Sequence, residues 1–240
     1  MESYEYANGR KNYCSISGIR NQKQNKACED VILIDETPTI RFYGLADGQS
    51  GKMYCREGGM ACLKRLFRYL SERGIPGIRQ YEYIDEIQYE IMKLLRQTIA
   101  QLAQEKQVPK DMFASTLVVF AYEVQTGDYL SVHLGDGCII GSKRNDGIII
   151  ISPPDNGMTL NYTWLTTSRD AMRHLRMGFG NIGNYERILL ITDGASSIAF
   201  GKNIPGDVQD MLINDSDEAI VNFIRESNPE DDASCILVDI

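Results

Sequence analysis

Acidic residues interrupt the sequence where apolar, strand-like runs begin or end. The five acidic sites of this kind are Glu29-Asp30, Asp47-Gly48, Asp136-Gly137, Asp193-Gly194 and Asp231-Asp232. Each Asp-Gly pair alone is typical of a tight turn and carries little information about function. If the five sites converge, their carboxylates form a negatively charged cavity in which the acids repel one another unless cations lie among them.

The cation that such a cavity would bind follows from its ligand atoms. Carboxylate and carbonyl oxygens select Mg²⁺, Mn²⁺ or Ca²⁺, whereas zinc sites use mainly histidine and cysteine. The chain has only two histidines, His133 and His174, and its six cysteines include no C-x-x-C pair. We therefore expect the cysteines to be reduced and buried, and we expect the chemistry to depend on carboxylates.

Composition and charge exclude several classes of protein. The 240 residues include 33 acidic and 25 basic side chains, and the net charge of −8 is opposite to that of a typical nucleic-acid-binding protein. No apolar run approaches the roughly 18 residues of a membrane span, and the acidic N-terminus differs from a signal peptide. We predict a monomeric, cytoplasmic protein that binds neither nucleic acid nor membrane. Because no repeat or linker divides the sequence, we also predict one domain over residues 1–240.

The elements that must position the acidic sites are mainly strands. Apolar or alternating runs predict strands over 12–18, 29–35, 39–46, 114–125, 128–135, 137–142, 147–152, 187–192 and 233–240. The turn at Thr126-Gly127-Asp128 predicts an antiparallel hairpin. Apolar residues at helical spacing predict helices around 63–70, over 84–106 and over 216–226. The first two helices should pair and cover one face of a sheet, in a mixed fold of packed sheets with helical outer layers.

One glycine pattern, Gly178-x-Gly180-x-x-Gly183, matches the dinucleotide-binding fingerprint. That fingerprint requires a strand before the glycines and a helix after them, whereas here an irregular stretch precedes them and a strand follows. We interpret this segment as a flexible surface loop without a nucleotide-binding role.

In their order and flanking residues, the acidic sites resemble the motifs of the metal-dependent (type 2C) protein serine/threonine phosphatases. The matching segments are Glu29-Asp30, Ala46-Asp47-Gly48-Gln49-Ser50-Gly51, Ser115-Thr116-Leu117, Gly135-Asp136-Gly137, Leu189-Leu190-Ile191-Thr192-Asp193-Gly194 and Asp231-Asp232-Ala233-Ser234-Cys235-Ile236-Leu237-Val238. Each segment alone is weakly specific, but their shared order is a strong signal, and it extends from about residue 14 to the C-terminus.

The resemblance implies a fold class and a reaction. The fold is α+β, a four-layer α-β-β-α sandwich in which two antiparallel sheets pack face to face and helices cover the outer faces. The reaction is hydrolysis of phosphoserine or phosphothreonine in proteins by a hydroxide that bridges two divalent cations, Mn²⁺ or Mg²⁺. The partner is therefore a phosphorylated protein, and no covalent phosphoenzyme forms.

The resemblance also implies a set of metal ligands. Asp47 would bridge the two cations. Asp193 and Asp231 would complete the protein ligands of the first cation, while Glu29 and the carbonyl oxygen of Gly48 would bind the second. This assignment uses only oxygen ligands, as the composition leads us to expect.

Three further residues receive roles from the resemblance. Asp30 is similar to the acid that orients the attacking water, and with Asp47 and Asp193 it makes up the predicted catalytic set. Asp136 stands where the family has a residue that supports a turn or borders a third metal site. The phosphate-binding arginine of the family is absent from its usual spacing, and Arg20 is the candidate for that role.

Some alternatives stay open. Register alone decides whether Asp231 or its neighbour Asp232 binds metal, and we favour Asp231. A pseudophosphatase that binds phosphoproteins as a regulator is the second hypothesis, although the presence of every predicted carboxylate ligand argues against it. A different divalent-metal hydrolase on an unrelated fold is the third, and it predicts that the Asp-Gly strand ends do not converge.

Overall fold

The computed structural model describes residues 12–79, 83–143, 147–157, 162–200, 206–213 and 218–240. Within these residues, the strands form two antiparallel sheets of five strands each. The strands of the first sheet are, in spatial order, β1 (Tyr13–Ile16), β10 (Ala233–Asp239), β9 (Arg187–Ile191), β6 (Cys138–Lys143) and β7 (Gly147–Ser152). Those of the second sheet are β2 (Val31–Glu36), β3 (Ile40–Ala46), β4 (Leu117–Glu123), β5 (Asp128–Leu134) and β8 (Arg176–Asn181).

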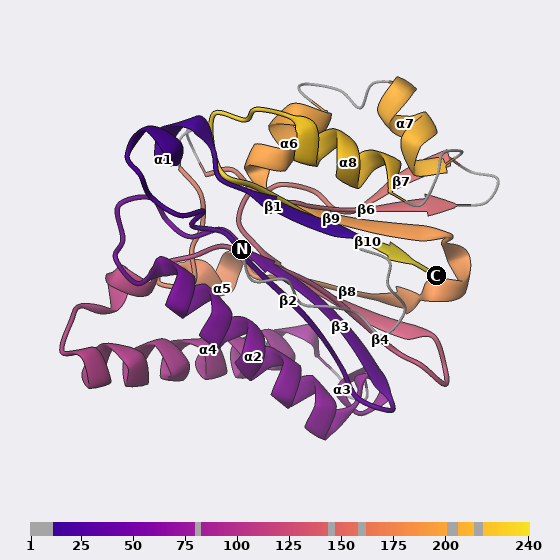
Figure 1. The fold of residues 1–240 in the computed structure, drawn as a ribbon. Coiled ribbons are helices and arrows are strands. Elements are labelled where there is room, and N and C mark those ends of the chain that lie inside the picture. Colours follow the sequence, from indigo (N-terminus) through magenta and orange to yellow (C-terminus); the bar gives the residue numbers. More distant parts are fainter. Residues whose placement is uncertain (1–11, 80–82, 144–146, 158–161, 201–205, 214–217) are drawn as a thin grey trace.

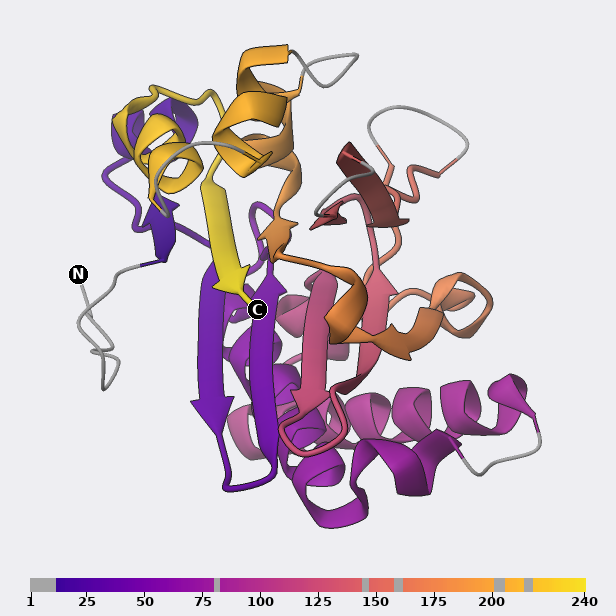
Figure 2. The ribbon, with the colours of Figure 1, turned by 90° about the vertical axis from the view of Figure 1, so that its right-hand side faces the viewer.

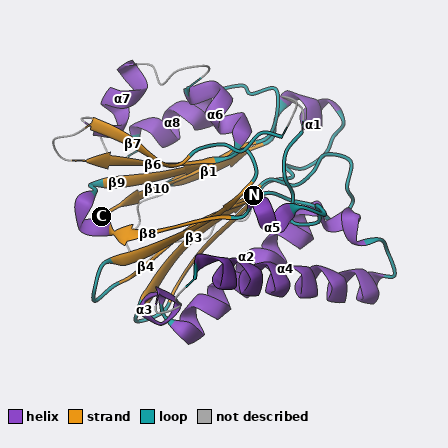
Figure 3. Ribbon diagram, turned by 180° about the vertical axis from the view of Figure 1, so that it is seen from behind, coloured by secondary structure: helices purple, strands orange, loops and turns teal. Residues whose placement is uncertain are grey.

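Helices cover the outer face of each sheet (Figures 1 and 3). The second sheet is covered by α2 (Cys55–Arg73), α3 (Ile75–Arg79) and α4 (Ile84–Lys106). The first sheet is covered by α6 (Asp193–Ala199), α7 (Gly206–Ile213) and α8 (Ala219–Glu226). The short helices are α1 (Ile19–Lys23), α5 (Ala171–His174), η1 (Lys110–Phe113) and η2 (Ile182–Asn184). The predicted four-layer α-β-β-α sandwich of α+β class is thereby confirmed.

Side-chain alternation along the central strands explains the layers. In β4, Leu117 and Val119 join the apolar core beneath α2 and α4, whereas Val118 and Phe120 join the core between the two sheets. Because both faces of the strand are buried, its sequence is a continuous apolar run. A separate core, which includes Leu189, lies between the first sheet and helices α6 to α8.

Helix α4 occupies the range 84–106 that periodicity predicts. Its buried residues Ile87, Ile91, Leu95 and Ile99 recur every four positions, so they lie on one face of the helix. That face belongs to the core beneath the second sheet, and α4 packs against α2. The predicted helical pair over one sheet face is therefore present.

Strand register brings the acidic sites to one end of the sandwich. Val31 at the start of β2 pairs with Ala46 at the end of β3. Glu29, which precedes β2, and Asp47, which follows β3, therefore lie at the same edge of the sheet. In the other sheet, the start of β10 pairs with the end of β9, which precedes Asp193. Antiparallel pairing thus places segments from distant parts of the chain beside one another.

The N-terminal strand β1 and the C-terminal strand β10 also pair with each other, and the end of β1 and the start of β10 lie near this edge. Strand β1 pairs with β10 (Figure 2), and the last pair in register joins Ile16 to Ala233. The segment that contains Gly18 and Arg20 therefore lies next to Asp231 and the other acidic sites.

The glycine-rich segment near residue 180 is a strand and not the surface loop that we expected. Residues Arg176–Asn181 form the edge strand β8, which pairs with β5 instead of forming a loop. A Cβ atom at Gly180 would lie 2.6 Å from the Tyr129 ring, so glycine allows this strand to pass the ring. The glycines remove the apolar alternation that would have indicated a strand.

Two other sequence expectations concern helices. Residues 216 and 217 of the third predicted helix lie outside the described residues, and α8 begins at Ala219. Throughout the described part of the chain, each helix is too short or too polar to cross a membrane.

Candidate active site

A cavity of about 400 Å³ opens at the end of the sandwich where the acidic segments meet. Six acids contribute to its lining: Glu29, Asp47, Asp136, Asp193, Asp231 and Asp232. The rest of the lining consists of Gly48, Gln49, Ser50, Tyr162, Thr163, Leu165, Thr167 and Ser168. The cavity is therefore rich in carboxylate and hydroxyl oxygens and includes no histidine or cysteine from the described residues.

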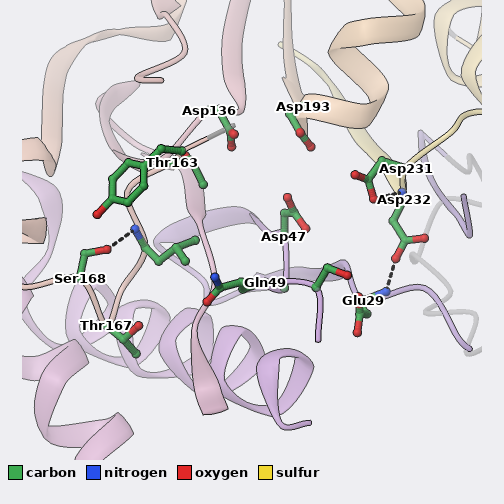
Figure 4. Close-up of a pocket in the computed structure, with 14 residues that line it drawn as sticks. Glu29, Asp47, Gln49, Asp136, Thr163, Thr167, Ser168, Asp193, Asp231 and Asp232 are labelled. Carbon is green, nitrogen blue, oxygen red and sulfur yellow. Dashed lines mark hydrogen bonds between the residues drawn. The ribbon is translucent and has the colours of Figure 1, made fainter. Parts of the chain in front are cut away.

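Three of the carboxylates form a compact group. Oxygen atoms of Asp47, Asp136 and Asp193 all lie within 4.8 Å of one another, and their side chains converge in Figure 4. Asp136 Oδ1 is buried and has no hydrogen-bond partner among the described residues. An all-oxygen group with an unsatisfied buried acceptor fits a hard divalent cation such as Mg²⁺ or Mn²⁺.

The electrostatics of the cavity point the same way. Burial, together with the negative charges of Asp30 and Asp193, raises the pKa of Asp47 well above its usual value. Burial and the charges of Asp136 and Asp231 raise the pKa of Asp193 to about 6. Without cations, the site therefore favours protonated acids, and a bound cation would favour their ionised forms.

Thr116 fixes the backbone of Asp47. The Asp47 N–H donates to Thr116 Oγ1 (2.9 Å), and the Thr116 N–H donates to the Asp47 carbonyl oxygen (2.8 Å). This exchange explains why a Ser-Thr-Leu segment accompanies the acidic motifs. The sequence pattern includes Thr116 but does not indicate its partner, which lies 69 positions earlier.

Gly48 allows two segments of the site to approach closely. A Cβ atom at this position would lie 2.7 Å from both the Glu29 carbonyl oxygen and Cys55 Sγ. Any larger residue would push the Glu29 segment away from the Asp47 turn. The glycine after Asp47 therefore has a packing role at the site.

Thr192 connects Asp30 to β10, the strand that follows the last acidic pair. Thr192 Oγ1 donates to Asp30 Oδ2 (3.1 Å) and accepts from the Ser234 N–H (3.0 Å). Asp30 is fully buried, which raises its pKa to about 7, and its Oδ1 has no hydrogen-bond partner in the described chain. Asp30 thus lies behind Asp47 and is not among the cavity-lining residues.

Asp231 and Asp232 occupy different environments. The Asp231 carboxylate is about half exposed and faces the other cavity acids in Figure 4, with Arg20 Nη1 3.3 Å away. Asp232 is buried, and its carboxylate accepts hydrogen bonds from the Gly18 N–H (2.7 Å), Asn21 Nδ2 (2.8 Å) and the Glu29 N–H. The acceptor capacity of Asp232 is therefore used within the protein, whereas Asp231 faces the cavity.

Arg20 is exposed and contacts Asp231, but it is not among the residues that line the cavity. Glu29, in contrast, lines the cavity and accepts a long hydrogen bond from Asn21 Nδ2 (3.5 Å). Burial raises the pKa of Glu29.

One wall of the cavity was not indicated by the sequence. Tyr162 and Thr163 line it, and the Tyr162 ring packs edge-on against Trp164. Trp164 in turn stacks on His174, whose Nδ1 lies 2.9 Å from Asp155 Oδ2. These residues come from the segment between β7 and β8, which carries no acidic motif.

The remaining histidine and the cysteines lie outside the cavity. His133 is fully buried, and its Nδ1 contacts Ser152 Oγ (2.8 Å) and the Arg176 guanidinium (2.9 Å). Burial and the charge of Arg176 lower the pKa of His133 to about 3. The six cysteines are free thiols, and all but the half-buried Cys28 are buried, as expected for reduced residues of a core.

Comparisons with known proteins agree with the fold and the motif order. A family model described as protein phosphatase 2C matches residues 17–234. A structure titled bacterial serine phosphatase superposes with a TM-score of 0.68 at 13% identity, covering 95% of this chain and 96% of the other. The serine/threonine phosphatase Stp1 from Staphylococcus aureus gives 0.64 at 13% identity, covering 100% and 99%.

A third structure, PppA, a regulatory component of T6SS in Pseudomonas aeruginosa, gives a TM-score of 0.63 at 16% identity, with 94% of each chain covered. At these identities the superpositions establish the shared fold. A search of curated proteins found no significant match.

Proposed function

Since the chain belongs to the protein phosphatase 2C family, we propose that it hydrolyses phosphoserine and phosphothreonine in proteins with the help of Mn²⁺ or Mg²⁺. The observation that carries the proposal is the compact group of Asp47, Asp136 and Asp193 inside an acidic cavity. We expect its substrates to be phosphorylated proteins, and we expect it to act as a cytoplasmic monomer on neither nucleic acid nor membrane.

The residues at the cavity suit two cation sites. Asp47 would belong to both, with Asp193 and Asp231 at the first and with Glu29 and the Gly48 carbonyl oxygen at the second. Bound together, two cations would lower the pKa of a water that attacks the phosphorus and would neutralise charge on the phosphoryl oxygens. Asp136 has a carboxylate oxygen within 4.8 Å of those of Asp47 and Asp193, and it would serve a further, weaker site.

The other residues would orient these groups. Thr116 fixes the Asp47 backbone through two hydrogen bonds and so would hold the point from which the carboxylate extends toward the cations. Asp30, which is buried behind Asp47 and does not line the cavity, would act on the attacking water indirectly, by orienting the groups that hold it. Arg20 would bind a phosphate oxygen, because its exposed guanidinium stands next to Asp231.

The proposal is tested with purified protein, p-nitrophenyl phosphate and a phosphothreonine peptide, each in the presence of Mn²⁺ or of a chelator. We expect hydrolysis that requires the cation, and we expect Asp47→Asn and Asp193→Asn to lose at least about 100-fold in activity. Asp35→Asn is the matched control, since Asp35 is an exposed aspartate at the other end of β2.

Two results would contradict the proposal. Hydrolysis that persists in chelator, or in both site variants, would show that the acidic cavity is not the catalytic centre. Binding of the phosphopeptide without hydrolysis would favour the alternative, a pseudophosphatase that acts as a phosphoprotein-binding regulator.

A further inference from the structure

Arg56 contacts the backbone on both sides of Glu29. Its guanidinium Nη1 donates to the carbonyl oxygen of Asp30 (3.0 Å) and to that of Cys28. Arg56 is the second residue of α2, the helix that follows the Asp47-Gly48 turn. One side chain therefore joins the helix after one acidic segment to the backbone of another.

The Glu29 backbone is held on its remaining sides as well. Its N–H donates to the Asp232 carboxylate, and its own carbonyl oxygen abuts Gly48, where a Cβ atom would lie only 2.7 Å away. The segment before it, residues 22–27, is exposed and contributes no buried side chain. Arg56 thus joins the backbone around Glu29 to helix α2 through its hydrogen bonds to Cys28 and Asp30.

The direction of these contacts indicates what Arg56 does. The Arg56 guanidinium donates to backbone carbonyl oxygens and forms no ion pair with the Glu29 carboxylate among the described contacts. It therefore fixes the backbone from which the Glu29 side chain extends and leaves the carboxylate available to a cation. Groups that orient a metal ligand commonly change metal affinity about 10- to 100-fold when they are removed. An arginine suits this task because its planar guanidinium can donate to two acceptors at once.

We propose that Arg56 is a positioning residue that holds Glu29 against the Gly48 turn and thereby sets the affinity of the cation site on the Glu29 side of the cavity. This inference rests on the proposed metal-dependent function. It assigns a role to a residue outside the acidic motifs, and it predicts an effect on one cation site and not on all of them.

The test measures Mn²⁺ binding to metal-free protein by isothermal titration calorimetry, with unfolding temperature in chelator as a check of folding. We expect Arg56→Ala to weaken one class of Mn²⁺ site about 10-fold or more and to leave the tightest remaining class within about 2-fold. Arg56→Lys should recover part of the loss. Arg68→Ala is the matched control, because Arg68 is an exposed arginine of the same helix.

A double-substitution cycle shows whether Arg56 acts through Glu29. Glu29→Gln should abolish the affected class of site, and adding Arg56→Ala to Glu29→Gln should then change Mn²⁺ binding no further. The Mn²⁺ concentration that gives half-maximal hydrolysis of p-nitrophenyl phosphate should rise in Arg56→Ala, while the rate at saturating Mn²⁺ stays near that of the unsubstituted protein.

Several results would overturn the proposal. Unchanged Mn²⁺ binding in Arg56→Ala, or equal weakening of every class of site, would do so. If Arg56→Ala does not fold, Arg56→Lys decides, and unchanged binding in that variant counts against the proposal. Absence of Mn²⁺ binding by the unsubstituted protein would instead overturn the proposed function, and this inference with it.

Discussion

The Asp232 carboxylate accepts a 2.7 Å hydrogen bond from the backbone N–H of Gly18, a residue 214 positions earlier in the chain. The same carboxylate also accepts from Asn21 and from the Glu29 N–H. A buried carboxylate with three donors is a fixed part of the protein scaffold. Asp232 therefore joins the N-terminal segment to the start of β10, and its neighbour Asp231 is left to face the cavity.

Substitution of the two neighbours should separate these roles. We expect Asp232→Ala to lower the free energy of unfolding of metal-free protein by roughly 1–3 kcal/mol, because three buried donors lose their acceptor. Asp231→Asn should change that free energy by less than about 1 kcal/mol, since its ion pair with Arg20 is exposed, yet it should lose Mn²⁺-dependent hydrolysis. Urea unfolding in chelator and phosphatase assays provide the two measurements.

The opposite pattern, with Asp231→Asn unfolding the protein and Asp232→Ala leaving a stable but inactive one, would reverse the assignment. Asp232→Asn is an informative control. It keeps one acceptor oxygen, so its stability should lie between that of Asp232→Ala and that of the unsubstituted protein.

A second prediction concerns the close approach of Gly18 to Asp231. A Cβ atom at Gly18 would lie 2.3 Å from the Asp231 carbonyl carbon, so Gly18→Ala must displace one of the two segments. We expect a loss of about 1–3 kcal/mol in the free energy of unfolding, together with weaker Mn²⁺ activation. Gly77→Ala is the control, because no atom lies within 4 Å of its Cβ position and alanine favours the helix. Equal stabilities of the two variants would contradict the prediction.

The sequence indicated most of the fold because its strands are long and buried on one or both faces. The run at 117–121 is continuous because neighbouring residues enter different cores, and the 84–106 range is periodic because one helix face is buried. Strand β8 was missed because its glycines carry no apolar pattern. Helix α6 begins at Asp193 itself, where the sequence reads as a strand followed by a turn.

Of the site, the sequence predicted the acidic segments and not the contacts between them. Convergence could be expected from strand ends, but the different environments of Asp231 and Asp232 depend on donors more than 200 positions away. Thr192 and Arg56 were not recognised for the same reason. Their partners, on the Glu29-Asp30 segment, become neighbours only through sheet register and helix packing.

Arg20 should contribute to substrate binding and little to stability. Because the Arg20 side chain is 67% exposed beside Asp231, we expect Arg20→Ala to change the free energy of unfolding by less than about 1 kcal/mol. Loss of a charge-assisted contact to phosphate should raise the KM for a phosphothreonine peptide about 10-fold, with a smaller change in kcat. Lys23→Ala, an exposed cation in the same helix, is the control. An unchanged KM would remove Arg20 from the phosphate site.

Asp30 should make the stability of metal-free protein depend on pH. Burial raises its pKa in the folded protein to about 7, whereas an unfolded aspartate has a pKa near 3.9. The folded state therefore binds this proton more tightly than the unfolded state. The stabilisation is fully present below about pH 4 and is lost as pH rises through 7, with a magnitude of at most roughly 4 kcal/mol.

The buried His133 acts in the opposite direction, because its pKa of about 3 in the folded protein lies below the usual value, so its contribution to stability is lost as pH falls below about 6.5. The effect of Asp30 alone is therefore the difference in free energy of unfolding between Asp30→Asn and the unsubstituted protein. In chelator, Asp30→Asn should gain stability relative to the unsubstituted protein as pH rises from 4 to 7, and the difference should level off above pH 7. Its amide carries no titrating proton, so any loss of packing is independent of pH.

Urea unfolding at several pH values measures the difference, and parallel curves would show that Asp30 does not retain its proton. Addition of Mn²⁺ should stabilise the unsubstituted protein most at the higher pH values, because a cation binds the ionised carboxylates that destabilise the metal-free site.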